Sequence, residues 1–329
     1  MTPAPTSARL SRSLVPLACL LLAACGRAPD PLAPAADEFS VMTYNLHQYA
    51  LADRDGDGQK SEPKPEAERA AAADLIAQAR PDVLAVQEIG GPAVFEEFRY
   101  ALASRGLDYG HAEYLQRGES EINLAVLSRF PIVSRQPHTD DRYSIGTAEI
   151  PVLRGFADVE IEVNPQYRFR LLVAHLKSKV FHALGQTEMR RNEARLLNKH
   201  VRAILKENPE ANLLVAGDFN DTYRSAALRE ALGEQGGLLA DLRPADADGD
   251  VWTRFEPAFD EYARIDYLLA SRGMLPEVVR EKTRVVHGPL AYQASDHRPV
   301  MAVFKAVDLA PTGDMRESSA KPAELQETD

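Results

Sequence analysis

The sequence has few cysteines, a single tryptophan and no long apolar run. Cys19 and Cys25 are the two cysteines among 329 residues. Cys19 lies in an N-terminal segment that we expect to be removed, so the mature chain would keep one cysteine and could form no internal disulfide. The apolar run LVPLACLLLAAC, which ends at Cys25, is too short to span a bilayer. These shortages exclude a small disulfide-stapled fold.

The N-terminus has the pattern of an export signal. Arg9 and Arg12 precede the apolar run, which ends in small residues, and this predicts a signal peptide over 1–24. The ending LAAC resembles a bacterial lipobox, whose cysteine is lipidated and becomes the new N-terminus. The resemblance implies an exported bacterial lipoprotein, held through Cys25 in a membrane of the periplasm or cell surface. The alternative is a plain secretory signal, cut near Ala24, and a secreted protein.

Composition divides the rest of the chain. A Pro/Ala-rich tether is expected over 25–37, a globular domain over 38–306 and a disordered tail over 307–329. With 26% charged and 45% hydrophobic residues, the composition is that of an ordinary globular protein. The formal net charge of −11 should repel nucleic acid and anionic lipid at long range. A polyanionic substrate would therefore need a divalent metal or a local basic patch.

The apolar pattern of the domain predicts alternating strands and helices. Strands are expected at 38–46, 81–88, 109–115, 122–128, 131–136, 155–163, 168–175, 212–217, 264–270 and 299–305, and helices at 66–80, 93–106 and 186–207. Both alternating and continuously apolar strands occur, which favours two packed sheets with helices outside, an α/β sandwich.

Unusual polar residues follow or precede these strands. The segment VAGDFND ends an apolar strand on Asp218 and Asn220, which could form a simple turn or point together into a cleft. Similar positions are held by Asn45, His47, Glu88, Glu121, His175, Lys177, Lys179, Asp266, Asp296 and His297. Carboxylates and amides are oxygen ligands for Mg²⁺, and the histidines and lysines could serve as acid, base and cationic clamps. The set is the inventory of a metal-assisted phosphoester hydrolase.

Five motifs in order resemble the endonuclease/exonuclease/phosphatase superfamily, which includes pancreatic deoxyribonuclease and bacterial extracellular nucleases. They are TYNL, QE, GDFND, IDY and SDH, across roughly residues 39–305. The resemblance implies a four-layer αββα sandwich of two mixed sheets flanked by helices. It also implies a phosphodiester hydrolase that depends on Mg²⁺, which Mn²⁺ could replace. The sequence indicates no protein partner, so a monomer is expected. The expected substrate is nucleic acid, DNA or RNA, met outside the cytoplasm.

The resemblance also implies roles for single residues. Glu88 resembles the main metal ligand, Asn45 a metal- and phosphate-binding amide, and Asp296 a further metal contact. Asp218 and Asn220 resemble the pair that orients the attacking water and holds the phosphate. His297 resembles the active-site histidine oriented by Asp266, and His175 a second histidine paired with Glu121. Either Asp218 or His297 could be the general base. His47 replaces an acid or Gln of several relatives, which favours a single catalytic metal.

Two features allow more than one interpretation. Lys177 and Lys179 in HLKSK could neutralise substrate phosphates, or they could be solvated lysines on an edge strand. Asp53, Asp55 and Asp57 in DRDGDG begin like a calcium loop, but Lys64 stands at the position of the closing Glu. The loop could bind Ca²⁺ or be an acidic solvated loop.

Two other functions stay open beside the nuclease. The first is hydrolysis of a lipid head group or another small phosphoester, as in sphingomyelinases and phosphatases of the same superfamily. The second is a non-catalytic, calcium-binding surface lipoprotein on the same scaffold.

Overall fold

The computed structural model describes residues 1, 32–118, 120–233 and 237–310. Contacts divide the chain into two units, Met1–Pro31 and Leu32–Asp329, and the described helices and strands all lie in the second. The predicted signal peptide with Cys25, the first part of the tether and the tail beyond residue 310 fall outside the described residues. Within the described ranges, no helix is long and apolar enough to cross a membrane.

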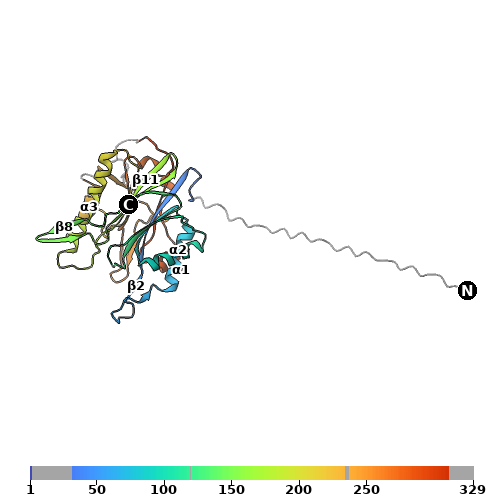
Figure 1. Ribbon diagram of the computed structural model, residues 1–329, viewed down its shortest axis with the longest axis horizontal. Coiled ribbons are helices and arrows are strands. Elements are labelled where there is room, and N and C mark those ends of the chain that lie inside the picture. The colour runs from blue at the N-terminus through green and yellow to red at the C-terminus, as the bar shows by residue number, and fades with distance from the viewer. Residues whose placement is uncertain (2–31, 119, 234–236, 311–329) are drawn as a thin grey trace, which may run out of the picture. The chain divides into compact units, whose positions relative to one another are not determined.

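Two six-stranded mixed sheets form the centre of the second unit (Figure 1). The first sheet has the spatial order β17 (Arg284–Val285), β18 (Val300–Lys305), β1 (Glu38–Tyr49), β4 (Val83–Ile89), β6 (Asn123–Ser128) and β5 (His111–Leu115). The second has the order β13 (Leu239–Asp241), β16 (Asp266–Ser271), β12 (Leu213–Asp218), β11 (Tyr167–His175), β10 (Phe156–Asn164) and β7 (Ile132–Arg135). The central strands are nearly continuous apolar runs because both faces of each sheet are covered.

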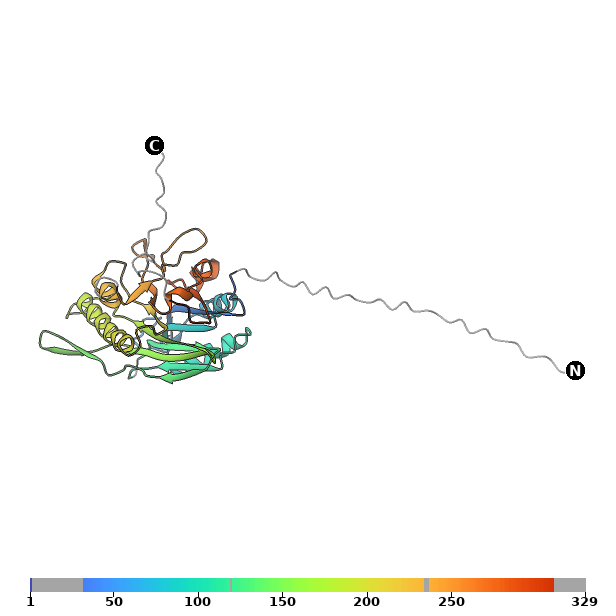
Figure 2. The same ribbon diagram turned by 90° about the horizontal axis from the view of Figure 1, so that it is seen from above.

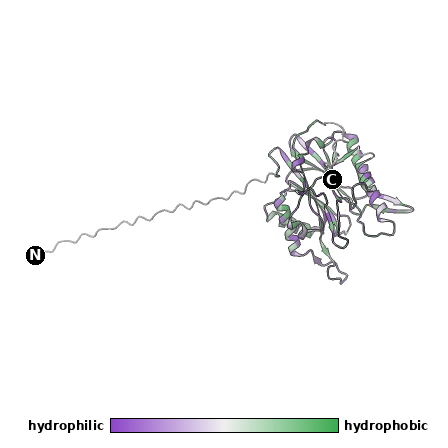
Figure 3. Cartoon of the chain, turned by 180° about the vertical axis from the view of Figure 1, so that it is seen from behind, coloured by the Kyte–Doolittle hydropathy of each residue, from purple (hydrophilic) through white to green (hydrophobic). Residues whose placement is uncertain are grey.

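Helices cover the outer face of each sheet and make a four-layer sandwich. The first sheet packs against α1 (Glu66–Ala79), α2 (Pro92–Ala103) and α5 (Pro289–Ala294). The second packs against α3 (Gln186–Glu207) and α4 (Ala226–Leu232). A third apolar cluster, with Phe39, Phe169 and Phe304 in stacking contact, fills the space between the sheets. Figure 1 shows α3 on one side of the strands and α1 and α2 on the other, and Figure 3 shows hydrophobic and hydrophilic residues mixed along the helices.

The predicted α/β sandwich is therefore confirmed, while several short elements were not expected from the sequence. These are the hairpins β2 (Leu51–Ala52) with β3 (Glu62–Pro63), β8 (Arg142–Ile145) with β9 (Ala148–Pro151) and β14 (Arg254–Glu256) with β15 (Glu261–Ala263), the 3₁₀ turns Leu275–Glu277 and Arg280–Lys282, and α4, α5, β13 and β17. Strands of two to four residues carry too few positions to show a periodic pattern. Figure 2 shows the β8–β9 hairpin extending away from the sheets.

The folded region continues past the predicted domain end at 306. Asn212 Nδ2 donates to Asp308 Oδ1 at 2.7 Å, and Leu309 N donates to Glu277 Oε1 at 3.4 Å. Asp308 and Leu309 thus contact the domain just beyond the end at 306 that the composition predicts.

Candidate active site

Strand pairing in the second sheet brings three of the expected residues side by side. His175 and Asp218 are register partners at the ends of the parallel strands β11 and β12. Asp218 is in turn opposite Asp266, the first residue of the antiparallel strand β16. This register places the three residues side by side at one edge of the sheet. Such an edge is where a scaffold commonly presents a functional site.

Gly217 explains why the strand before Asp218 ends as it does. Its φ is +137°, and a Cβ there would lie 1.9 Å from the carbonyl oxygen of Ala174. Asn220 also has a positive φ of 51°, and its backbone N–H donates to Asp218 Oδ1 at 2.7 Å. The segment GDFND is thus both a tight turn and a strand end directed into the site. Asp221, at the end of this segment, accepts from Arg190 Nε at 3.1 Å.

His297 lies between carboxylates in a buried position. Its Nδ1 is 2.8 Å from Asp266 Oδ2, and its Nε2 is 3.9 Å from Asp218 Oδ2. Burial alone would lower the pKa of His297, but the charges of Asp266, Asp218 and Asp296 outweigh it and raise that pKa. Burial and the charge of Asp266 also raise the pKa of Asp218. The pair therefore favours a protonated imidazole beside a carboxylate of high proton affinity.

Thr253 and Ser295 hold this pair in place, and sequence reasoning did not single them out. Thr253 Oγ1 accepts from the backbone N–H of Asp266 at 3.0 Å. Ser295 Oγ accepts from the backbone N–H of His297 at 3.0 Å and donates to the carbonyl oxygen of Asn45 at 2.9 Å. The only signal in the sequence was the closeness of Ser295 to the SDH motif, since Thr253 is far from any motif along the chain.

Glu88 and Asn45 come from the first sheet and meet Asp218 across the sandwich. Asn45 Nδ2 donates to Glu88 Oε1 at 3.2 Å and to Asp218 Oδ2 at 3.0 Å. Asn45 Oδ1 accepts from the backbone N–H of His47 at 2.9 Å. In this orientation the Asn45 amide nitrogen donates to two carboxylates, and the metal- and phosphate-binding role expected for its oxygen stays a prediction.

The backbone next to Glu88 is strained. Glu88, His47 and Gln48 have φ values of 64°, 47° and 51°. The pairing of β1 with β4 is irregular between Asn45 and Tyr49, and Gln48 N donates to Glu88 Oε2 at 2.8 Å. Residues with positive φ cost about 1–3 kcal/mol each and cluster at functional sites. The bulge turns Glu88 toward the second sheet.

His175 is buried and faces acidic groups other than the one expected. Its Nε2 lies 3.5 Å from Asp218 Oδ2 and 3.7 Å from Glu88 Oε1. Burial, followed by the positive charge of Arg154, lowers the pKa of His175. Glu121 forms no ion pair with His175 within the described ranges, and its Oε2 lies 3.8 Å from where a Cβ of Gly91 would be. The predicted His175–Glu121 pair is corrected, because the turn before β6 carries Glu121 toward the start of α2.

Asp296 lies at the rim of the site with two unexpected neighbours. Arg254 Nε donates to Asp296 Oδ2 at 2.9 Å, and His47 Nδ1 lies 3.7 Å from Asp296 Oδ1. Arg254 also pairs with His297 through an isolated β-bridge. The β14–β15 hairpin is therefore attached directly to the segment that carries Asp296 and His297.

The carboxylates fit the chemistry of a hard divalent cation. Asp266 Oδ1 and Asp296 Oδ1 are buried and accept no hydrogen bond from any described residue. Ligand atoms of Asp218, Asp266 and His297 also lie within 4.8 Å of one another, and of these the two carboxylates can bind a cation while His297 is protonated. Carboxylate oxygens are the usual ligands of Mg²⁺ and Mn²⁺. The residues present could therefore hold a divalent metal.

The expected phosphate clamps are engaged elsewhere. Lys177 Nζ donates to the carbonyl oxygens of Ser178 at 3.1 Å and Val180 at 2.9 Å. Lys179 Nζ lies 3.5 Å from Glu261 Oε1. The Lys177 side chain is buried and stabilises its own loop, which corrects the phosphate-binding role expected for it. Lys179 keeps partial exposure but already has an acidic partner.

The acidic loop gathers a different set of carboxylates from the one expected. Ligand atoms of Asp53, Asp55 and Glu62 lie within 4.8 Å of one another. Asp57 instead accepts from the backbone N–H of Gln59 at 2.7 Å. Lys64 is buried and lies 2.9 Å from Glu68, so it takes no part in the loop.

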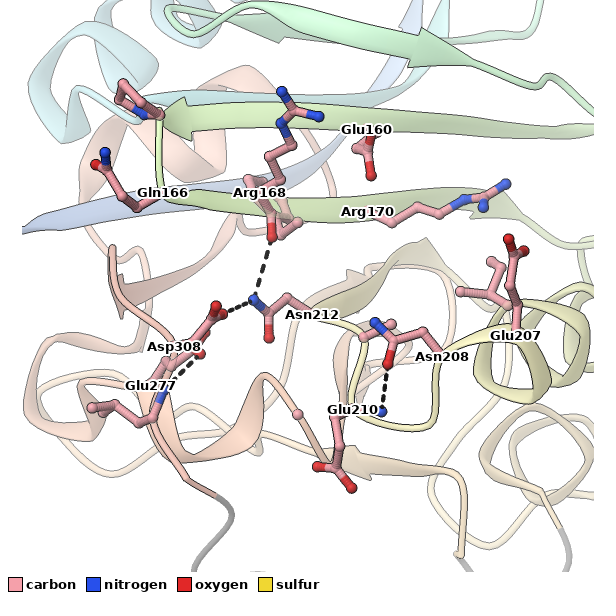
Figure 4. Close-up of a pocket in the computed structure, with 16 residues that line it drawn as sticks. Glu160, Gln166, Arg168, Arg170, Glu207, Asn208, Glu210, Asn212, Glu277 and Asp308 are labelled. Carbon is pink, nitrogen blue, oxygen red and sulfur yellow. Dashed lines mark hydrogen bonds between the residues drawn. The ribbon is translucent and has the colours of Figure 1, made fainter.

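A cavity of about 690 Å³ lies away from this site, where β11 and β12 begin. Figure 4 shows its polar lining, in which Asn212 donates to the carbonyl oxygen of Arg168 and to Asp308. The parallel strands end at the opposite edge, with His175 and Asp218. The cavity therefore contains none of the expected site residues.

Solved structures share this fold at low sequence identity. Truncated Caenorhabditis elegans TDP2 aligns with 21% identity and a TM-score of 0.55, over 82% of this chain and 98% of that one. The human Nocturnin catalytic domain with bound sulfate aligns with 18% identity and a TM-score of 0.56, over 83% and 96%. An endonuclease/exonuclease/phosphatase family protein from Bacteroides thetaiotaomicron aligns with 18% identity and a TM-score of 0.55, over 83% of this chain and 98% of that one.

No curated protein matches the chain. A family model described as endonuclease/exonuclease/phosphatase matches residues 42–297, well over half of the sequence. Both the described site and the five sequence motifs lie in or beside this range. The chain belongs to the endonuclease/exonuclease/phosphatase family.

Proposed function

We propose that this chain is a divalent-metal-dependent phosphodiester hydrolase, and specifically a nuclease that acts outside the cytoplasm on DNA or RNA. The observation that carries the proposal is the position of Asp218. Its Oδ2 lies within 4.0 Å of His297 Nε2 and His175 Nε2 and accepts from Asn45 Nδ2. A carboxylate in this position can accept a proton from the attacking water. The two imidazoles and the amide beside it can stabilise negative charge on the phosphate.

Mg²⁺ or Mn²⁺ would be held by Glu88, with Asp296 as a further ligand, and would supply Lewis-acid polarisation of the phosphate. Asp218 acts as the general base toward the attacking water, because its raised pKa gives it a useful proton affinity. His297 stays protonated and stabilises charge that develops on the phosphate oxygens. Asp266 orients the ring through Nδ1.

His175 acts as a neutral imidazole. Its pKa is lowered, and its Nε2 faces Glu88 and Asp218, which favours a proton on Nε2. Nδ1 is buried and makes no hydrogen bond with any described residue. The Nε2–H group is thus directed at the space between the carboxylates, where it can donate to a phosphate or leaving-group oxygen.

A second candidate, hydrolysis of a lipid head group, is favoured by one observation. In the loop that follows β11, the side chains of Val180 and Phe181 are 71% and 82% exposed. Exposed apolar patches mark contacts with membranes or partners. Lys177 in the same loop is not free to neutralise a polyanion.

A substrate panel separates these candidates. Plasmid DNA, RNA, sphingomyelin and bis-p-nitrophenyl phosphate are each incubated with Mg²⁺, Mn²⁺, Ca²⁺ or EDTA. We expect cleavage of DNA or RNA with Mg²⁺ or Mn²⁺ and none with EDTA. Cleavage of sphingomyelin without cleavage of nucleic acid would select the lipid candidate. Hydrolysis of none of the four would refute both and leave the calcium-binding lipoprotein.

We also propose that Cys25 is lipidated and anchors a monomer to the membrane outside the cytoplasm. The support is the LAAC ending and the tether that follows it. Fractionation should find the wild-type chain with the membrane and Cys25→Ser in the soluble or unprocessed fraction. An unmodified mature N-terminus beyond Cys25 would rule out the anchor.

A further inference from the structure

Two oppositely charged side chains of α3 are buried behind the site. Arg190 is 4% exposed and Glu193 is 0% exposed. They are three residues apart and so lie on the same face of the helix. Burying a charged group is unfavourable unless it is paired or hydrogen-bonded. Each of the two buried groups therefore requires hydrogen-bond or ion-pair partners.

Both side chains form hydrogen bonds with the backbone of Lys177, two residues after His175. Glu193 Oε2 accepts from the N–H of Lys177 at 2.6 Å, while its Oε1 accepts from the N–H of Leu153 at 3.2 Å. Arg190 Nη1 donates to the carbonyl oxygen of Lys177 at 3.0 Å. The Lys177 backbone is thus held at its N–H by Glu193 and at its carbonyl oxygen by Arg190.

Arg190 also connects this segment with the next strand. Its Nε donates to Asp221 Oδ2 at 3.1 Å, three residues after Asp218. A direct link runs between the same segments, since Asn220 Nδ2 donates to the carbonyl oxygen of Leu176 at 3.0 Å. Helix α3 therefore fixes the ends of β11 and β12 relative to each other.

We infer that Arg190 and Glu193 are positioning residues that set the distance between the His175 imidazole and the Asp218 carboxylate. The inference rests on the proposed function. The Arg190 guanidinium is buried and already donates to the Lys177 carbonyl oxygen and to Asp221, so Arg190 does not belong to a substrate-binding basic patch. A displacement of about 1 Å in a reacting group can cost about 10²-fold in rate. We call the hydrogen bonds of Arg190 and Glu193 to the Lys177 backbone the clamp. The clamp therefore acts on turnover more than on substrate binding.

A double-mutant cycle tests the clamp. Arg190→Lys keeps the charge but cannot bridge a carbonyl and a carboxylate with a planar fork. We expect kcat to fall about 10²-fold with KM changed less than about threefold, as for loss of positioning alone. In a His175→Ala background the same change should cost less than about threefold, because residues that act as a unit are not additive. An equal loss in both backgrounds would overturn the inference.

Arg191→Lys is the matched control. Arg191 neighbours Arg190 on α3, but its Nε pairs at the surface with Glu230 at 2.9 Å. We expect kcat close to that of the wild type. A loss as large as that of Arg190→Lys would mean that α3 is sensitive to any change, which contradicts a specific clamp.

Amide hydrogen exchange tests the clamp without any hydrolysis. Glu193→Gln leaves one oxygen to accept from two N–H groups, so the Lys177 amide should exchange at least about tenfold faster while the centre of β12 keeps its protection. Arg191→Lys should change neither. Unchanged protection of Lys177 in Glu193→Gln would refute the clamp. A wild-type chain that hydrolyses no phosphodiester would refute the proposed function alone.

Discussion

His297 Nδ1 lies 2.8 Å from Asp266 Oδ2, and both side chains are almost fully buried. The contact joins the segment before β18 in the first sheet to the start of β16 in the second. It therefore fixes an imidazole from one sheet against Asp218 of the other. The protonation state of His297 depends on this contact.

Asp266→Asn should shift the alkaline limb of the pH–rate profile to lower pH. The wild-type carboxylate helps to raise the pKa of His297, so removing its charge lowers that pKa. The imidazole then loses its proton at a lower pH, and activity that needs the imidazolium falls earlier. The measurement is kcat/KM against pH, with Asp260→Asn in an exposed turn as control. An unmoved alkaline limb would mean that His297 does not act as a cation.

Gly217→Ala should destabilise the fold strongly. The new Cβ would lie 1.9 Å from the carbonyl oxygen of Ala174 at a φ of +137°. Strained backbone costs about 1–3 kcal/mol, and overpacking costs a similar amount. Gly146→Ala is the control, because Gly146 has a φ of +60° with nothing within 4 Å of the added atom. Denaturant unfolding should show a clearly larger loss at 217, and equal losses would contradict the geometry.

Glu277→Gln should raise stability at alkaline pH. Burial raises the pKa of Glu277 from 4.5 to about 8, although Tyr167 and the N–H of Leu309 donate to it. The folded state then keeps a proton that the unfolded state loses, so wild-type stability falls as pH rises through this window. Glutamine removes the fall. The melting temperature of the variant relative to wild type should be higher at pH 9 than at pH 5 by several degrees, in order of magnitude. A constant difference would refute the raised pKa.

Calcium should stabilise the chain if the acidic loop binds it. Excess Ca²⁺ would raise the melting temperature by mass action, and the triple Asp→Asn variant of Asp53, Asp55 and Asp57 should lose this response. The structure adds a finer expectation, because Glu62 and not Asp57 lies with Asp53 and Asp55. Glu62→Gln should weaken the response more than Asp57→Asn. An unchanged melting temperature in excess Ca²⁺ would favour a solvated loop.

Long periodic elements could be predicted from the sequence, and contacts between distant segments could not. The helix expected at 186–207 is α3, because its apolar face repeats over many turns. The strand-end residues were found because each follows or precedes a clear apolar run. The partner of His175 was not, since the path of the turn before β6 decides where Glu121 goes. Lys177 was misread because its charge is used by carbonyl groups of its own loop. Neither the path of that turn nor the hydrogen bonding of Lys177 can be recognised in the local sequence.

The most direct test of the account is the rate of phosphodiester hydrolysis by His297→Ala in saturating Mg²⁺, on the best substrate of the panel. The fold of the variant is checked by its circular dichroism spectrum, and exposed Tyr100→Ala serves as the control. We predict that kcat falls about 10²–10⁴-fold, the usual worth of a group that handles a proton or charge in the transition state. Near-normal hydrolysis by His297→Ala would contradict the assigned site.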